Sequence, residues 1–369
     1  MVMRDGDALD VRPGGDPTHA APRHHAAYHT TAFFLTLYAA ALAAWTVYGI
    51  VQGDGSVWDF VEGLFNPGAA PASQLVGPYE WAFAAACLAT AGLAVAHRRP
   101  ARSAALFCGF FLLAVSLREA IGLSDAAYRD QYATDPLGGW ALATRVLGLV
   151  VAVVVLTKMF PARETAGAAK KRAVAGRWRR PRAGGSAPVA PTLLAAPDAP
   201  PLCPGPRDRR LARICGVLFL IMGLARLSWT TYDLTSAGMA AARRYLRGAV
   251  DGSVLGTLNL ATSSEFTTLG SLLGFLVLGV LACRARHDVR GALLVFASVE
   301  LYLIVRTVVW LTVTDFFNQS FATPDGALYM ATTAFGLAAM TSVLVLAMGR
   351  GLKVGEGVVD GVGPGVGEG

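Results

Sequence analysis

Long apolar runs alternate with short polar segments over most of the chain. Each run carries few charges and is about twenty residues long, the length an α-helix needs to cross the roughly 30 Å hydrocarbon core of a bilayer. The pattern therefore predicts an all-α, polytopic membrane protein with eight transmembrane helices. The predicted spans cover residues 31–51, 80–97, 103–122, 138–160, 211–231, 265–283, 291–313 and 327–349.

The eight spans form two sets of four because the chain repeats itself. Self-similarity at a fixed spacing is the mark of duplicated structural units, so we expect two tandem four-helix bundles, over residues 31–160 and 211–350. A shift of 184 residues pairs the segments that begin at Trp45 and Trp229. A shift of 188 residues pairs Arg102 with Arg290, Arg118 with Arg306, and Pro136 with Pro324.

Three segments outside the bundles are polar or low in complexity, and such compositions bury too little apolar surface to fold on their own. Residues 1–30 are expected to form a disordered tail and residues 351–369 a disordered Gly/Val-rich tail. Residues 161–210 form a basic, Pro/Ala-rich linker. The first tail contains His19, His24, His25 and His29, which we interpret as solvated, although a His-rich tract can also bind metal.

The basic residues predict the orientation of the chain. Short loops rich in Lys and Arg stay in the cytoplasm, and the basic segments 97–102, 161–210 and 284–290 fall on one side of the predicted spans. We therefore expect a bacterial plasma membrane protein with both termini cytoplasmic. The linker either only fixes this topology or also binds anionic lipid headgroups, at about 1 kcal/mol per basic residue.

One loop departs from this charge pattern. The other loops on the non-cytoplasmic side, at 52–79, 123–137 and 314–326, are acidic, whereas the 232–264 loop carries three arginines. Because Met239, Leu246 and Val250 alternate with those arginines at helical spacing, the loop is predicted to contain a short interfacial helix.

Composition supports a membrane class and excludes several activities. The chain is 54% hydrophobic and 15% charged, and its net charge of +7 is concentrated in a few segments. That distribution reports orientation, so no nucleic-acid partner is expected. The five cysteines lack metal-type spacing and are interpreted as apolar fillers. No nucleotide-binding loop, metal-binding motif or catalytic triad is recognisable, so no catalytic residue or metal site is predicted and the cofactor is unknown.

Charged residues inside the spans are the candidate site, because such residues are costly in a membrane and are usually functional. They gather in the outer third of the predicted membrane core, with Glu300 near the midplane. A midplane carboxyl needs a partner on another helix or must be protonated. The candidates are Arg118, Glu119, Arg145, Arg226, Arg306 and Glu300, with Glu80 and Glu265 opening spans at the outer edge.

Two interpretations of these residues stay open. They either neutralise one another as interhelical pairs that specify assembly, or line a pocket for an anionic or carbonyl-bearing ligand, which a guanidinium fork suits. In either case we expect Arg226, Glu300 and Arg306 to form one polar cluster, with Glu265 closing it from above.

Each half has the same order of features around its second and third spans. An acidic residue opens the second span, a helix rich in Leu, Gly and Ala follows, and a short basic turn leads into an Ala-rich third span. The first copy runs from Glu80-Trp81 to Arg98-Arg99-Pro100-Ala101-Arg102, and the second from Glu265 through Gly270, Gly274 and Gly279 to Arg284 and Arg290.

This order resembles the DoxX-like four-helix membrane family, present as two tandem copies. The resemblance implies an accessory membrane subunit, associated in some members with quinone-linked sulfur oxidation. Only Glu80 and Glu265 carry over, without an assigned role. The fusion of two copies, the basic linker and the Ala-rich second span depart from the family pattern.

The sequence thus favours a non-enzymatic accessory or small-molecule-binding membrane module with an Arg/Glu site in its outward half. The alternatives are a small-molecule transporter and a membrane subunit of a quinone-linked oxidoreductase. A transporter needs a polar path toward the cytoplasm, and the sequence offers little of one. The expected partners are the lipid bilayer, anionic headgroups at the linker and another membrane protein.

Overall fold

A computed structural model describes residues 19–52, 56–69, 75–162, 206–255, 260–284, 289–314 and 316–349. Most of the predicted tails and linker therefore lie outside the described residues. Within the described residues the regular structure is helical, apart from one isolated β-bridge between His19 and Arg98. The helices are η1 (Pro22–His24), α1 (His25–Gln52), α2 (Val57–Phe65), α3 (Pro78–Val95), α4 (Pro100–Gly122), α5 (Ala126–Thr134), α6 (Gly138–Met159), α8 (Pro206–Ala237), α9 (Met239–Val250), η2 (Gly252–Leu255), α10 (Ser264–Cys283), α11 (Arg290–Val313), α12 (Phe316–Ser320) and α13 (Pro324–Gly349).

Among the described residues, seven helices are long and apolar enough to cross a membrane: α1, α4, α6, α8, α10, α11 and α13. The predicted class of all-helical, multi-pass membrane protein is therefore confirmed. Helix α3 coincides with the remaining predicted span but is only 18 residues long. Its first turn contains Pro78, Glu80 and Trp81, which lower its hydropathy.

The predicted helix starts were late at two places. Helix α1 begins at His25 and α8 begins at Pro206, each before the expected start of its span. Residues 25–30, expected to belong to the N-terminal tail, thus form the first turns of α1. They carry polar histidines that a hydropathy pattern assigns to a loop, but those histidines pack against the α3–α4 turn.

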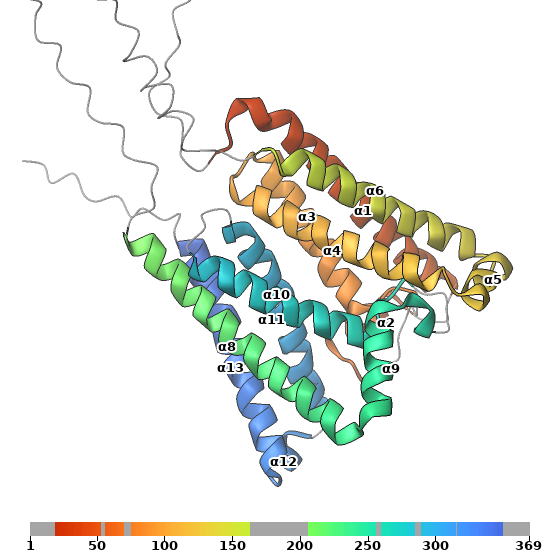
Figure 1. The fold of residues 1–369 in the computed structure, drawn as a ribbon, viewed down its shortest axis with the longest axis vertical. Helices are drawn as coiled ribbons and strands as arrows, with labels where there is room; N and C mark the ends of the chain where they lie inside the picture. Colours follow the sequence, from red (N-terminus) through yellow and green to blue (C-terminus); the bar gives the residue numbers. More distant parts are fainter. Residues whose placement is uncertain are drawn as a thin grey trace, which may run out of the picture.

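The seven candidate spanning helices and α3 pack in two groups of four. Helix α1 packs against α3 and α6, and α4 packs against α6. In the second group α8 packs against α10 and α13, and α11 packs against α13. Figure 1 shows the red-to-yellow and green-to-blue helices as two sets, with α11 packed against α3 and α4 between them.

Each group has its own apolar core. The first contains Leu35, Leu112 and Val155, and the second contains Phe219, Phe275 and Met340, all 1% exposed or less.

The ends of the spanning helices define two faces. On the basic face, Arg102 Nε at the start of α4 donates to Met159 O at the end of α6, over 3.0 Å. There Arg290 Nε at the start of α11 likewise donates to Ala347 O near the end of α13, over 2.7 Å. The short helices α2, α5, α9 and α12 lie at the opposite ends (Figure 1), which we call the loop face.

The two groups touch closely where α4 and α11 begin. Gly291 N donates to Ser103 Oγ over 3.0 Å, between residues that are 188 positions apart. A Cβ atom at position 291 would overlap the Pro100 carbonyl, so this approach of backbone to backbone requires glycine. Deeper in the joint, the rings of Phe107 and Phe296 lie 5.6 Å apart.

Candidate functional site

In the first group, three of the predicted charged residues form a buried cluster near the loop face. Glu119 Oε1 accepts hydrogen bonds of 2.7 Å from both Tyr128 and Tyr132 in α5. Glu119 Oε2 lies 3.5 Å from Arg145 Nε, and Arg145 Nη2 donates to the Leu260 carbonyl. Arg118, Glu119 and Arg145 are each at most 8% exposed. Each charged side chain of this cluster has a partner within the protein, which favours a structural role.

The tyrosines of this cluster lie outside the spanning helices and keep their protons. Burial raises the pKa of Tyr128 to about 12, and burial together with the Glu119 charge raises the pKa of Tyr132 further. Both hydroxyls therefore act as donors to Glu119 at any physiological pH. Their spacing of four residues on α5 places both hydroxyls over the same carboxylate.

Glu80 joins the two groups of helices. It is the third residue of α3, where its side chain accepts from Gly77 N at the helix start. Its other oxygen accepts from both the backbone and the hydroxyl of Thr262, each at 2.7 Å. Glu80 thus accepts three hydrogen bonds. It caps the start of α3 and links it to the loop before α10.

Arg118 and Arg306 each reach across to the other group. Arg118 Nη2 donates to the carbonyls of Gly248 and Asp251, over 3.2 and 3.4 Å, at the end of α9. Arg306 Nη2 donates to the Gly63 carbonyl near the end of α2, over 3.4 Å. The last carbonyls of a helix lack intrahelical partners and carry partial negative charge, so a cation there is favourable.

This arrangement corrects the expectation that Arg306 shares a cluster with Glu300. The two residues lie on different sides of α11, and Arg306 is held by a helix end that the sequence pattern did not reveal. Glu265 also lies elsewhere than expected. It is half-buried and lies beside Gly248, where a Cβ would be 3.4 Å from its carboxyl carbon, and so beneath α9.

The remaining predicted pair forms as an interhelical contact in the second group. Glu300 of α11 is fully buried, and its Oε2 accepts from Arg226 Nη2 of α8 over 2.6 Å. Its Oε1 accepts from the Ser271 hydroxyl of α10, which also accepts from Arg226 Nη1 over 2.9 Å. Arg226 further lies over the Phe275 ring, 5.5 Å from its centroid. The midplane carboxyl thus has two partners on two other helices.

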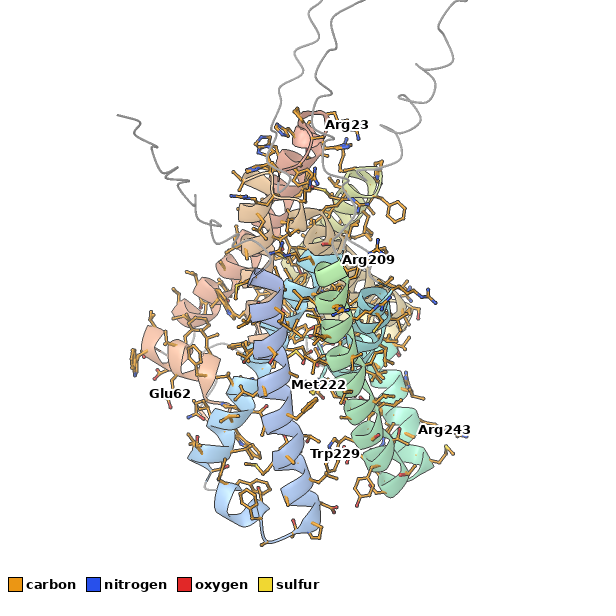
Figure 2. The ribbon with its side chains drawn as sticks, turned by 90° about the vertical axis from the view of Figure 1, so that its left-hand side faces the viewer. Arg23, Glu62, Arg209, Met222, Trp229 and Arg243 are labelled. Atoms are coloured by element: carbon orange, nitrogen blue, oxygen red, sulfur yellow. The ribbon has the colours of Figure 1, made fainter. Side chains whose placement is uncertain are left out.

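Arg226 also borders a cavity that opens between α8, α11 and α13. The cavity has a volume of about 330 Å³, and the Arg226 side chain is 28% exposed. Figure 2 shows Met222 and Trp229 of α8 on the side that faces α13. We call this cavity the Arg226 pocket; it is lined by Met222, Ala225, Arg226, Trp229, Thr230, Asp233, Thr268, Ile304, Thr307, Tyr329, Thr332 and Thr333.

The five threonines of the pocket were missed from the sequence. Threonine is common in membrane helices, because its hydroxyl can bond to the backbone of its own helix. Thr307 and Thr333 do so here, donating to the carbonyls of Leu303 and Tyr329. Only their convergence on one space distinguishes them, and a linear pattern does not contain that information.

The histidines of the N-terminal segment meet at the basic face. The rings of His25 and His29 both contact His97 in the α3–α4 turn, with centroids 3.9 and 4.7 Å away. His97 Nε2 lies 3.2 Å from His29 Nε2. Among the described residues, no group of three or more His, Cys, Asp or Glu side chains has an arrangement that could hold a metal ion.

Comparison of the chain with family models, with curated proteins and with solved structures finds no match. The site therefore has to be interpreted from its own geometry.

Proposed function

We propose that the chain consists of two tandem four-helix units with eight spans, the eighth being α3. The contacts on the basic face support this duplication. Arg102 and Arg290 are 188 residues apart, and so are their acceptors Met159 and Ala347. Arg118 and Arg306, which the same shift pairs, both donate to the carbonyl end of a short loop-face helix from the other unit.

The two units are related by an approximate twofold axis along the membrane normal. Ser103 contacts Gly291, its own counterpart under the 188-residue shift, and a residue can meet its counterpart only near such an axis. An even number of spans per unit gives both units the same orientation. In this proposal the basic face is cytoplasmic, both termini lie on that side of a bacterial plasma membrane, and each unit is DoxX-like.

The proposed function is binding of a small molecule in the Arg226 pocket, as a non-enzymatic membrane module. The single observation that carries it is the cavity of about 330 Å³ beside the Arg226–Glu300 ion pair, whose carboxylate is fully buried. Ligand pockets are commonly of this size, with mixed apolar walls and a few fixed polar groups. Trp229, Tyr329 and Ile304 supply the apolar walls here.

The charges of the pocket favour an uncharged ligand. Glu300 neutralises Arg226 at 2.6 Å, so a free anion would find little net positive charge there. Asp233 adds a negative charge to the lining. Arg226 has five N–H donors and can still donate to a carbonyl or hydroxyl oxygen, while the threonine hydroxyls have free lone pairs for ligand donors.

Binding is favoured over transport because the second unit is apolar below the pocket. Toward the basic face its core contains Phe219, Phe296, Met340 and Val343, all buried. A transported polar molecule would have to cross that layer without hydrogen-bond partners, at several kcal/mol per polar group.

Thermal unfolding of the detergent-purified protein with three matched compounds tests the function. Benzamide offers an uncharged carbonyl, amide donors and a flat ring, whereas benzoate and benzylamine carry a negative and a positive charge on the same ring. We expect benzamide to raise the unfolding temperature most. Equal or greater stabilisation by benzoate would indicate an anion site instead, and no stabilisation by any of the three would contradict the proposal.

A pair of threonine variants locates the binding. Thr307→Phe fills the pocket, so it should abolish the benzamide effect. Thr341→Phe is the control, because Thr341 is exposed, lies outside the pocket, and also donates to the carbonyl four residues earlier. If both variants keep the effect, the compound binds elsewhere.

A further inference from the structure

Helix α9 has an apolar stripe that no described part of the chain covers. Met239, Leu246 and Val250 are 73%, 54% and 53% exposed. At 100° per residue these three fall within a narrow sector of the helix. Gly248 and Ala249 are buried instead and face the helices below. The exposed stripe is therefore a second side of α9, distinct from its packing side.

The arginines of α9 flank this stripe. Arg243 and Arg247 lie beside it on the helix, whereas Arg244 points further round. Arg244 and Arg247 both line a cavity shared with α5. All three are exposed, and α9 contains no acidic residue. Figure 2 shows Arg243 projecting away from the bundle. Only Arg247 has a close acidic neighbour among the described residues, Asp251 at 3.2 Å.

The position of α9 places this stripe at the level of a membrane surface. It follows the spanning helix α8 after Gly238, whose φ of 83° allows the sharp turn. It then runs along the loop face to reach α4 (Figure 1). There Arg118 donates to the Gly248 carbonyl near the end of α9. A helix with apolar residues on one side and arginines beside them is typical of helices that lie in the lipid headgroup layer.

We propose that α9 lies in the headgroup layer of the leaflet on the loop face and binds anionic phospholipid headgroups through Arg243 and Arg247. The guanidinium groups suit phosphate oxygens, and the apolar stripe enters the boundary of the acyl chains. This role also explains why an otherwise acidic face carries one basic loop: its charges are directed to lipid.

Helix α2 is a built-in comparison for this proposal. It also lies on the loop face, on the opposite side of the molecule from α9 (Figure 2), and exposes Val57, Trp58 and Phe65. Its charged residues are Asp59 and Glu62, with no basic residue. It should therefore meet the bilayer through aromatic and aliphatic groups alone, without a preference for anionic lipid.

Depth measurements on the full chain test the proposal. Single cysteines at Leu246 and, as the α2 control, at Phe65 are placed in a chain without its native cysteines, labelled with a fluorophore and reconstituted. The vesicles contain either phosphatidylcholine alone or equal parts of phosphatidylcholine and phosphatidylglycerol. Quenching by brominated acyl chains is compared with quenching by aqueous acrylamide, which is uncharged and is therefore not repelled by anionic vesicles.

We expect the Leu246 label to be protected from acrylamide at least twofold better in vesicles with phosphatidylglycerol, and the Phe65 label to show no such difference. The result overturns the proposal if the Leu246 label is equally open to acrylamide in both vesicles. It is also overturned if the Phe65 label responds to phosphatidylglycerol as strongly as the Leu246 label.

Charge variants identify the groups involved. In the Leu246-labelled chain, Arg243→Gln with Arg247→Gln should remove the difference between the two vesicles, whereas Arg244→Gln should retain it. All three side chains are exposed, so the fold should be unaffected, and gel filtration of the reconstitution stock checks this. An equal loss for Arg244→Gln would show a general charge effect rather than binding by the two flanking arginines.

Discussion

The two groups of four helices, the two units of the proposed duplication, each contain one Arg–Glu pair, but in different places. In the first unit Glu119 of α4 meets Arg145 of α6. In the second unit Arg226 of α8 meets Glu300 of α11. Under the 188-residue shift Glu119 and Arg145 correspond to Thr307 and Thr333, which line the Arg226 pocket.

The positions of the second unit's ion pair are apolar in the first unit. Arg226, shifted by 184, and Glu300, shifted by 188, correspond to Leu42 and Leu112, which are buried apolar residues. At these positions the first unit is therefore charged where the second has threonines, and apolar where the second is charged. If the two units are copies, as proposed, a handful of exchanges is enough to move the ion pair from one place in the helical frame to another.

Breaking the Arg226–Glu300 pair should have the largest effect. Glu300→Leu leaves Arg226 without its partner, and removing one member of a buried pair costs about 3–5 kcal/mol. Because Arg226 is 28% exposed and can turn toward water, we expect a loss near or below the lower end of that range. Thermal unfolding in detergent measures it.

The double variant Glu300→Leu with Arg226→Leu copies the first unit at both positions. Since two leucines leave no unpaired charge, it should recover most of the lost stability while losing ligand binding. A double variant as unstable as Glu300→Leu would mean that the two units pack differently at these positions.

Transplanting the other pair should close the pocket. Thr307→Glu with Thr333→Arg gives the second unit the side chains of the first, so we expect the benzamide effect to disappear. The fold should survive, because the two charges can pair with each other. Either single variant leaves one unpaired charge in the membrane core, so each should be less stable than the double variant. Retained binding in the double variant would contradict the correspondence of the two sites.

Replacing Arg118 or Arg306, each of which binds a helix of the other unit, should have a smaller effect on stability, and the two effects should differ. Arg118 is 4% exposed and reaches two carbonyls, whereas Arg306 is less buried and reaches one. Because these hydrogen bonds are long, 3.2 to 3.4 Å, each should contribute less than the roughly 1.5–3 kcal/mol of a well-formed charged hydrogen bond. We expect Arg118→Gln to increase amide exchange in α9 more than Arg306→Gln increases it in α2. Equal or reversed changes would contradict the expectation that the more buried arginine, with two carbonyls, stabilises its helix more.

Lowering the pH should have the smallest effect on stability, and only in the first unit. Burial lowers the pKa of His97 below its usual value near 6.5, and the nearby His25, His29 and His19 lower it further. The folded state thus binds fewer protons than the unfolded state, so the contact is stable above that pH and weakens as the pH falls below it. Once the intrinsic pH dependence of amide exchange is divided out, the protection of residues 25–30 should fall as the pH is lowered from 7.5 to 5.5.

His97→Gln should remove this pH dependence without changing exchange in the second unit. There the start of α8 carries Arg209, Arg210 and Arg213, whose charge does not change in this range. A pH response of α8 equal to that of α1 would assign the effect to a general loosening of the basic face.

The sequence predicted the helices far better than the site. All eight apolar runs coincide with helices, because the length and hydropathy of a membrane span are local properties. The partners of Arg118 and Arg306 could not be predicted, since each arginine binds backbone carbonyls of a distant short helix, and carbonyls have no residue signature. Glu300 was correctly expected to find a partner on another helix, but Arg226 alone of the two proposed arginines supplies it.

Helices α2 and α9 are each bound by an arginine of the other unit. The order of these contacts along the chain bears on how the protein is inserted during synthesis. Arg306 enters the membrane 243 residues after Gly63, so its acceptor is already in place. Arg118 precedes its acceptor Gly248 by 130 residues, so when the first four helices have been inserted its charge still lacks those carbonyls. The packing of the first unit is therefore completed only when α9 of the second unit has been made, before α10, α11 and α13 follow.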